Sequence, residues 1–435
     1  MTDINHRRVL RIALPIVISN ATVPILGAVD TGVVGQLGAA APIGAVGLGA
    51  VILASLYWVF GFLRMGTTGL VAQAKGAGDH AEIAANLSRA LLIGGGAGLA
   101  IILAQLPLFA AAFYLSPASA EVESLAHSYL SIRIWGAPAT ISMYALTGWL
   151  IALERTRAVL LVQVWMNGLN IALDLWFVLG LGWGVPGVAI ATLISEWSGL
   201  ALALWLARDA LQGGHWRRAA LVFDRARLVL MARVNSDIMI RSVLLQAAFT
   251  SFLFLGAGLG DTTLAANQVL VQFLSIIAFS LDGFAFAAET LTGQALGARR
   301  PTTLRRAAIV TSEWGVGGAV LLALFFWLVG PALIDTMATA PEVRETARVY
   351  LPWLIASPLI GIASWMFDGI FIGTTLSREM RNAMLASVAI YVAAVAVLLP
   401  TFGNHGLWAA LMILNAARGL TMAAFYPRAE ARARA

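Results

Sequence analysis

The stretch AQAKGAGD at 72–79 occurs a second time in related form, as GQALGARR at 293–300, after a shift of 221 residues. The alignment places Gln73 over Gln294 and Gly76 over Gly297. Further matches follow in the same order, with the shift drifting to 219 at the end: Glu121 with Glu342, Tyr129 with Tyr350, Gly148 with Gly369, Arg157 with Arg378, and GVPG at 184–187 with GNHG at 403–406. One match could be chance, but this number in one order predicts two repeated halves.

The composition shows what surrounds these halves. Hydrophobic residues make up 60% of the 435 residues and charged residues only 11%, against about a quarter charged in an average globular protein. A soluble chain of this kind could not cover its surface with polar groups. We therefore expect lipid around most of the chain, which excludes a soluble enzyme and a disordered regulator.

The net charge of +6 does not indicate a nucleic-acid partner. The basic residues lie in short loops between apolar stretches and form no continuous binding face. The chain has no cysteine, which excludes disulfides, thiol nucleophiles and thiolate metal sites.

Because about 20 apolar residues cross a bilayer, the chain divides into twelve expected helical spans. They cover 9–37, 43–74, 86–114, 125–153, 158–182 and 185–207 in the first half, and 238–259, 263–297, 303–337, 345–376, 382–402 and 405–426 in the second. The predicted fold class is an all-α polytopic membrane protein of two six-helix lobes.

We expect an N-lobe at 1–207, a cytoplasmic linker at 208–236 and a C-lobe at 237–435. Because six spans per repeat is an even number, the lobes have the same orientation and are related by a pseudo-two-fold axis along the membrane normal. This is the plan of a two-lobed transporter with a cavity between the lobes near the midplane. Duplication for stability alone is the alternative.

Arginine predicts the orientation. With the N-terminus in the cytoplasm, 22 of the 28 lysines and arginines fall in inner segments, and only Arg344 and Arg348 fall in outer loops. The positive-inside rule then predicts that both termini are cytoplasmic. We expect a multi-pass membrane protein in contact with lipids.

Two carboxylates within spans of the first half are candidates for function, because ionisable groups in a membrane are costly. Asp30 lies in the first span. Asp174 lies in the fifth, where Asn167, Asn170 and Asp174 share one helical face by their spacings of three and four. A carboxylate away from water gains from binding a proton, so these groups could couple a proton gradient to helix movement. The alternative is that they only tie helices together.

The second half carries further acids, Asp282, Glu289 and Asp368, and an amide at Gln246. Two interpretations stay open for this set. It lines the cavity and binds substrate or a cation, or it pairs with the in-span arginines Arg64, Arg241 and Arg418.

Motifs of enzymes are missing from the sequence. It contains no G-x-x-x-x-G-K-[ST] phosphate loop, no H-E-x-x-H and no G-x-S-x-G. We expect no catalysis, no bound metal and no cofactor beyond a coupling ion.

Six stretches spread over nearly the whole chain match one family: RIALPIVISNATVPILGAVDTGVVGQLG (11–38), FLRMGTTGLVAQAKGA (62–77), NIALDLWFVLG (170–180), LDGFAFAAETLTGQALGAR (281–299), FDGIFIG (367–373) and GNHGLWAAL (403–411). They resemble the multidrug and toxic compound extrusion (MATE) transporters, in particular the branch of DNA-damage-inducible protein F (DinF). The resemblance implies an antiporter that alternates between inward- and outward-facing states. Such transporters export cationic or amphipathic small organic compounds in exchange for protons or sodium ions.

The resemblance also implies roles for particular residues. Proton coupling falls on Asp30, Asp174, Asn170 and Thr192, and a bending point of the first helix falls on Pro15. Another branch of the family binds cations with acids of the second half. Asp368 matches one of these acids, but span 7 carries Gln246 where the other would lie, which favours protons over sodium.

The expected function is therefore that of a proton-coupled exporter, and we expect it to be a monomer in a bacterial inner membrane. A sodium-coupled exporter and a flippase of lipids or lipid-linked precursors are the alternatives, and a flippase would need arginines such as Arg64 in the cavity. A membrane scaffold without transport and a channel are further alternatives, but a scaffold leaves the acids in the spans unexplained.

Overall fold

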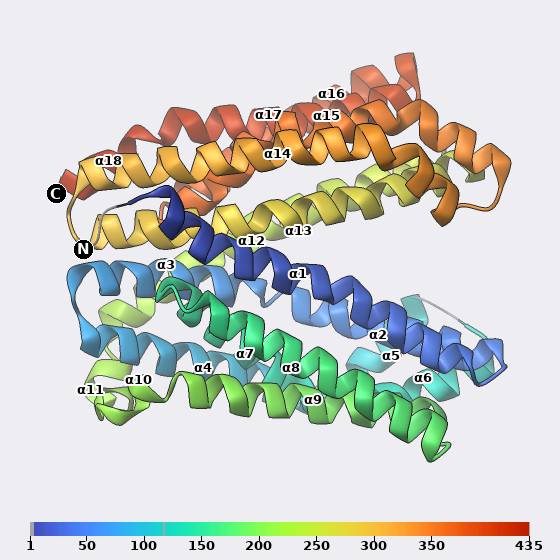
Figure 1. Ribbon diagram of the computed structural model, residues 1–435, viewed down its shortest axis with the longest axis horizontal. Coiled ribbons are helices and arrows are strands. Elements are labelled where there is room, and N and C mark those ends of the chain that lie inside the picture. Colours follow the sequence, from blue (N-terminus) through green and yellow to red (C-terminus); the bar gives the residue numbers. More distant parts are fainter. Residues whose placement is uncertain (1–3, 116–117, 435) are drawn as a thin grey trace. The chain divides into compact units, whose positions relative to one another are not determined.

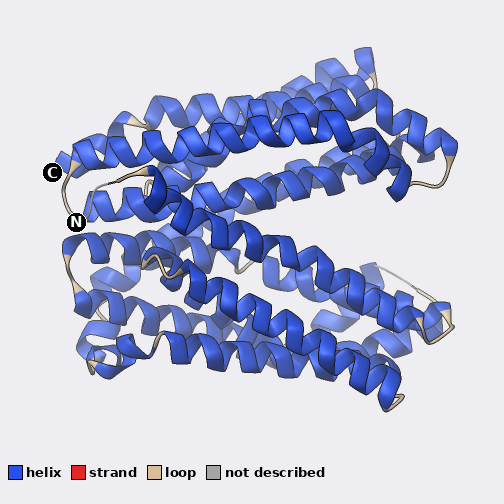
Figure 2. Ribbon diagram, in the orientation of Figure 1, coloured by secondary structure: helices blue, strands red, loops and turns tan. Residues whose placement is uncertain are grey.

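The computed structural model describes residues 4–115 and 118–434, without the side chains of 23–28 and 31. Helices make up nearly all of this part of the chain, and no strand occurs in it (Figure 2). The prediction of an all-α fold is confirmed.

Contacts between Cα atoms divide the chain into two compact units. Unit 1 comprises Met1–Val17, Thr68–Gly78 and Met231–Ala435, and unit 2 comprises Ile18–Thr67 and Asp79–Leu230. These units follow packing, so they differ from the lobes expected at 1–207 and 237–435. Two segments of the first half, at 1–17 and 68–78, pack with the second half, and the lobe boundaries themselves stay a prediction.

Three helices contribute to both units: α1 (His6–Gly35), α3 (Gly61–Ala77) and α12 (Arg225–Ala257). The other helices of unit 2 are α2 (Ala40–Trp58), α4 (His80–Leu103), α5 (Gln105–Leu115), α6 (Ala120–Arg133), α7 (Ala137–Ala152), α8 (Thr156–Asp174), α9 (Gly184–Leu206), α10 (Arg208–Gln212) and α11 (Ala219–Val222). The other helices of unit 1 are α13 (Asp261–Gly297), α14 (Pro301–Met337), α15 (Pro341–Gly373), α16 (Ser377–Phe402), α17 (Asn404–Phe425) and α18 (Pro427–Arg434) (Figure 1).

Helix covers most of each of the twelve expected spans, with short breaks at 59–60 and at 104 and with several span ends outside the helices. In the described part of the chain, ten helical segments are long and apolar enough to cross a membrane by length and composition. The expected span at 9–37 is α1. The span at 125–153 is α6 and α7, which a 3₁₀ turn (Ile134–Gly136) separates. The chain is thus a multi-pass membrane protein.

Within each unit, neighbouring helices pack as close pairs. In unit 2, α4 packs on α7, α8 on α9 and α2 on α6. In unit 1, α13, α14 and α15 pack on one another, and α16 packs on α17. Glycine permits the closest approaches. A Cβ atom on Gly98 of α4 would overlap with Pro138 of α7, and one on Gly94 would lie 2.9 Å from the Cα of Ser142. Small residues at helix crossings are typical of membrane bundles.

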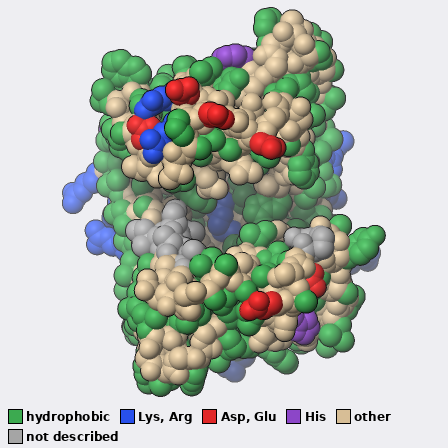
Figure 3. All heavy atoms as spheres, turned by 90° about the vertical axis from the view of Figure 1, so that its right-hand side faces the viewer, with side chains coloured by type: hydrophobic (Ala, Val, Ile, Leu, Met, Phe, Trp, Pro, Cys, Tyr) green, Lys and Arg blue, Asp and Glu red, His purple; other side chains and the backbone are tan. Residues whose placement is uncertain are grey.

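The surface is mainly hydrophobic. Green side chains cover much of the face in Figure 3, and acidic and basic ones gather at a few places. Large exposed side chains include Leu103, Leu106, Phe254, Leu328 and Leu420. Such exposure would be unfavourable in water, and it agrees with contact to lipid.

The expected linker at 208–236 is folded over most of its length. It contains α10, a 3₁₀ turn (His215–Arg217) and α11, and α12 begins at Arg225, well before the expected span at 238. The apolar run Leu228, Val229, Leu230 and Met231 lets α12 begin early, because it extends the hydrophobic pattern of the span.

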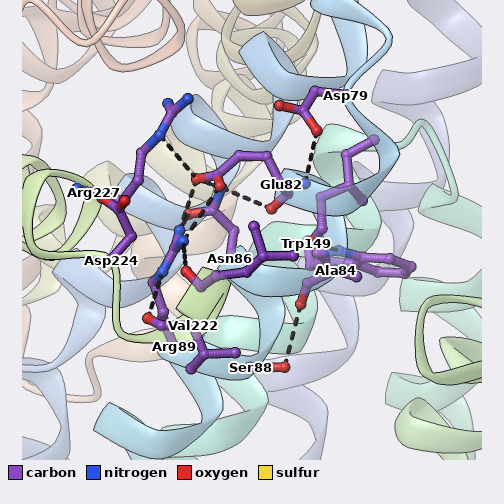
Figure 4. Close-up of polar contacts among 12 residues, drawn as sticks. Asp79, Glu82, Ala84, Asn86, Ser88, Arg89, Trp149, Val222, Asp224 and Arg227 are labelled. Atoms are coloured by element: carbon purple, nitrogen blue, oxygen red, sulfur yellow. Dashed lines mark hydrogen bonds and ion pairs between the residues drawn. The ribbon is translucent and has the colours of Figure 1, made fainter. Parts of the chain in front are cut away.

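A buried arginine attaches this linker to α4 (Figure 4). Arg89 is 2% exposed; it donates to the carbonyls of Val222 at 2.9 Å and Leu221 at 2.5 Å, and it forms an ion pair with Glu82 at 2.7 Å. Ser88 adds a hydrogen bond of 2.7 Å to the carbonyl of Trp216. Arg89 is therefore structural, although its position in the sequence suggested only an inner-loop charge.

Candidate functional site

A polar face of α8 is the starting point of the candidate site. Asn167, Asn170 and Asp174 are 7%, 1% and 0% exposed, so the face expected from their spacing is buried. Asn167 donates to the hydroxyl of Thr22 in α1 at 2.8 Å and accepts from Gln163, one turn earlier, at 3.0 Å. The face thus binds α8 to α1 through its first amide.

The carboxyl groups of Asp30 in α1 and Asp174 in α8 are within hydrogen-bonding contact of each other. Two carboxylates can share a hydrogen bond only if one of them carries a proton. One oxygen of Asp174, Oδ1, is buried and has no hydrogen-bond partner among the described residues. The structure thus places two carboxyl groups side by side inside the helical bundle.

Asn170 connects this carboxyl pair to α9. In the amide orientation that satisfies all its neighbours, its nitrogen donates to Asp30 Oδ1 at 3.2 Å. Its oxygen then accepts from the backbone N–H of Thr192 at 3.2 Å and from the hydroxyl of Thr192 at 3.1 Å. The structure thus brings together all four residues that the family resemblance assigns to proton coupling.

The backbone at Asp174 is irregular. Asp174 is the last residue of α8, and a π-helical turn (Leu175–Gly180) follows it directly. Single π-turns occur frequently at functional sites, because the widened turn re-aims the neighbouring side chains. This irregular turn directly adjoins the carboxylate of Asp174.

A buried ion pair lies on the same face of α9 as Thr192. Glu196, one helical turn after Thr192, pairs with Arg133 of α6 at 2.6 Å, and both side chains are only 10% exposed. Gly136, in the 3₁₀ turn after α6, leaves the space for this carboxylate, since a Cβ atom there would overlap with Glu196 Oε2. The positive charge of Arg133 also acts on both Asp30 and Asp174.

The sequence analysis missed this pair. Arg133 and Glu196 are 63 residues apart, and Glu196 lies in its span without a partner nearby in the sequence. The spacing of four between Thr192 and Glu196 was the available signal, because it places both side chains on one face of their own helix.

The second half holds a different arrangement. Asp368 of α15 is 7% exposed and forms ion pairs with Arg241 of α12 and, at 2.6 Å, with Arg418 of α17. Arg418 also donates to Asn415 at 3.1 Å. Of the two interpretations left open, the structure therefore shows pairing with arginine for Asp368.

The other candidates of the second half differ in their burial. Glu289 is buried, Asp282 is half-buried and Gln246 is exposed. Pro15 lies within the continuous helix α1, and its role as a bending point stays a prediction. Among the described residues no group of three or more His, Cys, Asp or Glu side chains could hold a metal ion.

Buried carboxylates within a bundle of repeated apolar helices define a polytopic membrane protein of the secondary-transporter type. The chain belongs to the MatE family, whose model matches residues 15–176 and again residues 238–401. Because one family model matches each half, the comparison agrees with the repeat found in the sequence.

Relatives with known names support this assignment over nearly the whole length. The chain is 39% identical to DNA damage-inducible protein F of Escherichia coli, over 96% of this chain and 91% of that protein. It is 28% identical to a probable multidrug resistance protein NorM of Pseudomonas aeruginosa, over 96% and 88%. A mutant of the Vibrio cholerae MATE transporter VcmN has the same fold, with a TM-score of 0.86 and 20% identity over 98% of this chain and 96% of that chain.

Proposed function

We propose that this protein is a proton-coupled antiporter that exports cationic or amphipathic organic compounds. The observation that carries the proposal is the contact between the carboxyl groups of Asp30 and Asp174, with Asn170 donating to Asp30. The names of its relatives support the class of substrate, since one is called a multidrug resistance protein.

The carboxyl pair supplies a reason for exchange. With one shared proton the pair carries one negative charge, and with a second proton it is neutral. A cationic substrate is attracted only while negative charge is present, so protons and substrate compete for the same groups. Such competition gives exchange, because each ligand stabilises a different state of the helices.

The transport cycle follows from this competition. Protons enter from the outer side and neutralise the pair, which weakens the attraction to the bound cation and releases it outward. Loss of the protons to the inner side restores the negative charge and prepares the site for the next cation. Hydrogen bonds from Asp30 to Asn170 and from Asn170 to Thr192 connect this carboxyl group to α9. A change in the protonation of Asp30 therefore alters the contacts of both α8 and α9.

The second half supports protons over sodium as the coupling ion. Sodium is held by oxygen ligands, and the carboxylate of Asp368 faces two guanidinium groups. An arginine next to a carboxylate neutralises the negative charge that a bound cation would otherwise neutralise. We place this transporter in a bacterial inner membrane with both termini in the cytoplasm, following its arginine distribution and its relative in Escherichia coli.

The test uses purified protein in proteoliposomes, with ethidium as the cationic probe and with proton and sodium gradients imposed separately. We expect uptake driven by the pH gradient in wild type and its loss in Asp30→Asn and Asp174→Asn. The exposed Asp261→Asn, at the start of α13, serves as the matched control and retains transport. Uptake that follows sodium and survives Asp30→Asn would contradict the proposal. Movement of labelled lipid without movement of ethidium would instead favour a flippase.

A further inference from the structure

A cavity of about 360 Å³ lies at the N-terminal end of α14 in unit 1. It is bordered by the first turn of α14, by the end of α18 and by His6 at the start of α1. Figure 1 shows α18 beside this end of α14, and the two helices are in contact. A volume of this size lies in the range of small-molecule sites, roughly 300–1,000 Å³.

One end of the cavity is basic. Arg305, Arg306 and Arg434 line it, and Arg305 is engaged by Glu430 through two hydrogen bonds of 2.8 and 2.6 Å. Arg306 donates to the backbone carbonyl of Ile4 at 2.9 Å, a neutral partner. Within the described residues neither Arg306 nor Arg434 forms an ion pair, and Arg434 acts on Glu430 only at longer range.

The beginning of α14 adds partial positive charge. The helix is 37 residues long, begins with Pro301 and has no acidic residue in its first turn. Pro301 and Thr302 of that turn line the cavity. The N–H groups of a first helical turn and the helix dipole favour an anion, and this turn lines the same cavity as two arginines.

The other end of the cavity is apolar. Ile309 and Val310 line it one turn further along α14, and Ile309 is 51% exposed. Glu313 lies beyond them, seven residues after Arg306 and therefore about 10 Å along the helix. Trp314 donates to His6 at 3.1 Å, and tryptophan is typical of the membrane–water interface. The cavity thus changes along α14 from basic side chains to apolar ones, with Glu313 beyond the apolar pair.

We propose that this cavity binds the phosphodiester headgroup of an anionic phospholipid, with Arg306, Arg434 and the first turn of α14 around the phosphate and the start of an acyl chain against Ile309 and Val310. Basic pockets between helices near a membrane surface bind such headgroups. The bound lipid links α14, α18 and the start of α1, the helix that carries Asp30 further along.

The test is binding to delipidated, full-length protein in detergent, measured by native mass spectrometry and by thermal shift. The probes are phosphatidylglycerol, phosphatidylcholine and soluble glycerol 3-phosphate. We expect phosphatidylglycerol to bind at least tenfold more tightly than phosphatidylcholine and to raise the unfolding temperature. The double variant Arg306→Gln, Arg434→Gln is expected to lose this preference.

Two further variants keep the test decisive. Arg434→Gln alone changes an exposed residue near the end of the chain, where folding tolerates substitution, and it should weaken binding of phosphatidylglycerol several-fold. Arg218→Gln, in the exposed part of the linker, is the matched control and should bind like wild type. Equal binding of both lipids, or variants with the wild-type preference, would overturn the proposal. If glycerol 3-phosphate bound as tightly as phosphatidylglycerol, the ligand of this cavity would be a soluble anion and not a lipid.

Discussion

The backbone carbonyl of Gln294 in α13 occupies the space in which a Cβ atom on Gly76 of α3 would stand, and the carbonyl of Gln73 blocks Gly297 in the same way. Gln73 and Gly76 are the repeat partners of Gln294 and Gly297. Each repeat therefore supplies both the glycine and the carbonyl, and α3 and α13 cross with a reciprocal contact inside unit 1. Two hydrogen bonds extend this contact. Arg8 donates to the side chain of Gln294 at 2.9 Å, and the side chain of Gln73 donates to the carbonyl of Gly373 at 2.8 Å.

This crossing predicts that Gly76→Ala and Gly297→Ala each destabilise the protein. A Cβ atom that meets backbone has no flexible neighbour to displace, and overpacking of this kind costs about 1–3 kcal/mol. Thermal unfolding in detergent measures the effect. Gly96→Ala in α4 is the control, because no atom lies within 4 Å of its Cβ position, and an unchanged midpoint is expected there. If Gly76→Ala also left the midpoint unchanged, the two helices would not cross as described.

The hydrogen bonds that join Asp30 to Asn170 and Asn170 to Thr192 predict that a variant of Asn170 loses transport but still folds. Asn170→Ala removes the hydrogen bond to Asp30. A hydrogen bond to a charged group contributes about 1.5–3 kcal/mol, so the initial rate of proton-driven ethidium transport should fall roughly tenfold or more. Thr192→Ser keeps the hydroxyl and should retain most of the rate. An Asn170→Ala protein with the wild-type rate would remove Asn170 from the mechanism.

The buried pair of Arg133 and Glu196 predicts a non-additive pattern in stability. Removing one partner leaves a buried charge alone, which costs about 3–5 kcal/mol. Arg133→Met and Glu196→Leu should therefore each lower the unfolding midpoint strongly, and the double variant should recover much of the loss. Unfolding midpoints of all four proteins complete the double-mutant cycle. Additive losses would show that the two side chains do not stabilise each other.

The ion pair between Arg155 and Asp209, which lies outside the membrane spans, predicts that the stability of the protein depends on pH. Arg155 donates to the carboxylate of Asp209 and holds the pKa of Asp209 below its usual range. Because the folded pKa is the lower one, the pair stabilises the protein above the unfolded pKa of about 3.9 and loses this effect as the pH falls through the folded value. Both side chains are more than a third exposed, so the contribution is about 0.2–1 kcal/mol.

Comparison of wild type with Asp209→Asn checks this sign. The wild-type protein should unfold at a slightly higher temperature at pH 7, and the difference should close as the pH approaches 3. A difference that grows toward low pH would contradict the assignment.

The sequence was sufficient for those parts of the fold that depend on local pattern. Apolar length predicted the spans, and spacing along α8 predicted the buried face of Asn167, Asn170 and Asp174. The 3₁₀ turn at Ile134–Gly136 was not predicted, because no local pattern marks it. The early start of α12 was missed, although the apolar run at 228–231 was a local signal for it. The ion pairs of Arg133 with Glu196 and of Asp368 with Arg241 and Arg418 join positions 50 to 127 residues apart. No local pattern contains such contacts.

The central claim is that substrate and protons compete for the carboxyl pair of Asp30 and Asp174. The most direct measurement adds ethidium to purified protein in weakly buffered detergent solution and records the pH. We predict that binding releases protons and acidifies the solution in wild type, and that Asp30→Asn abolishes the release. Binding of ethidium without proton release, or equal release from the double variant Asp30→Asn, Asp174→Asn, would contradict the account.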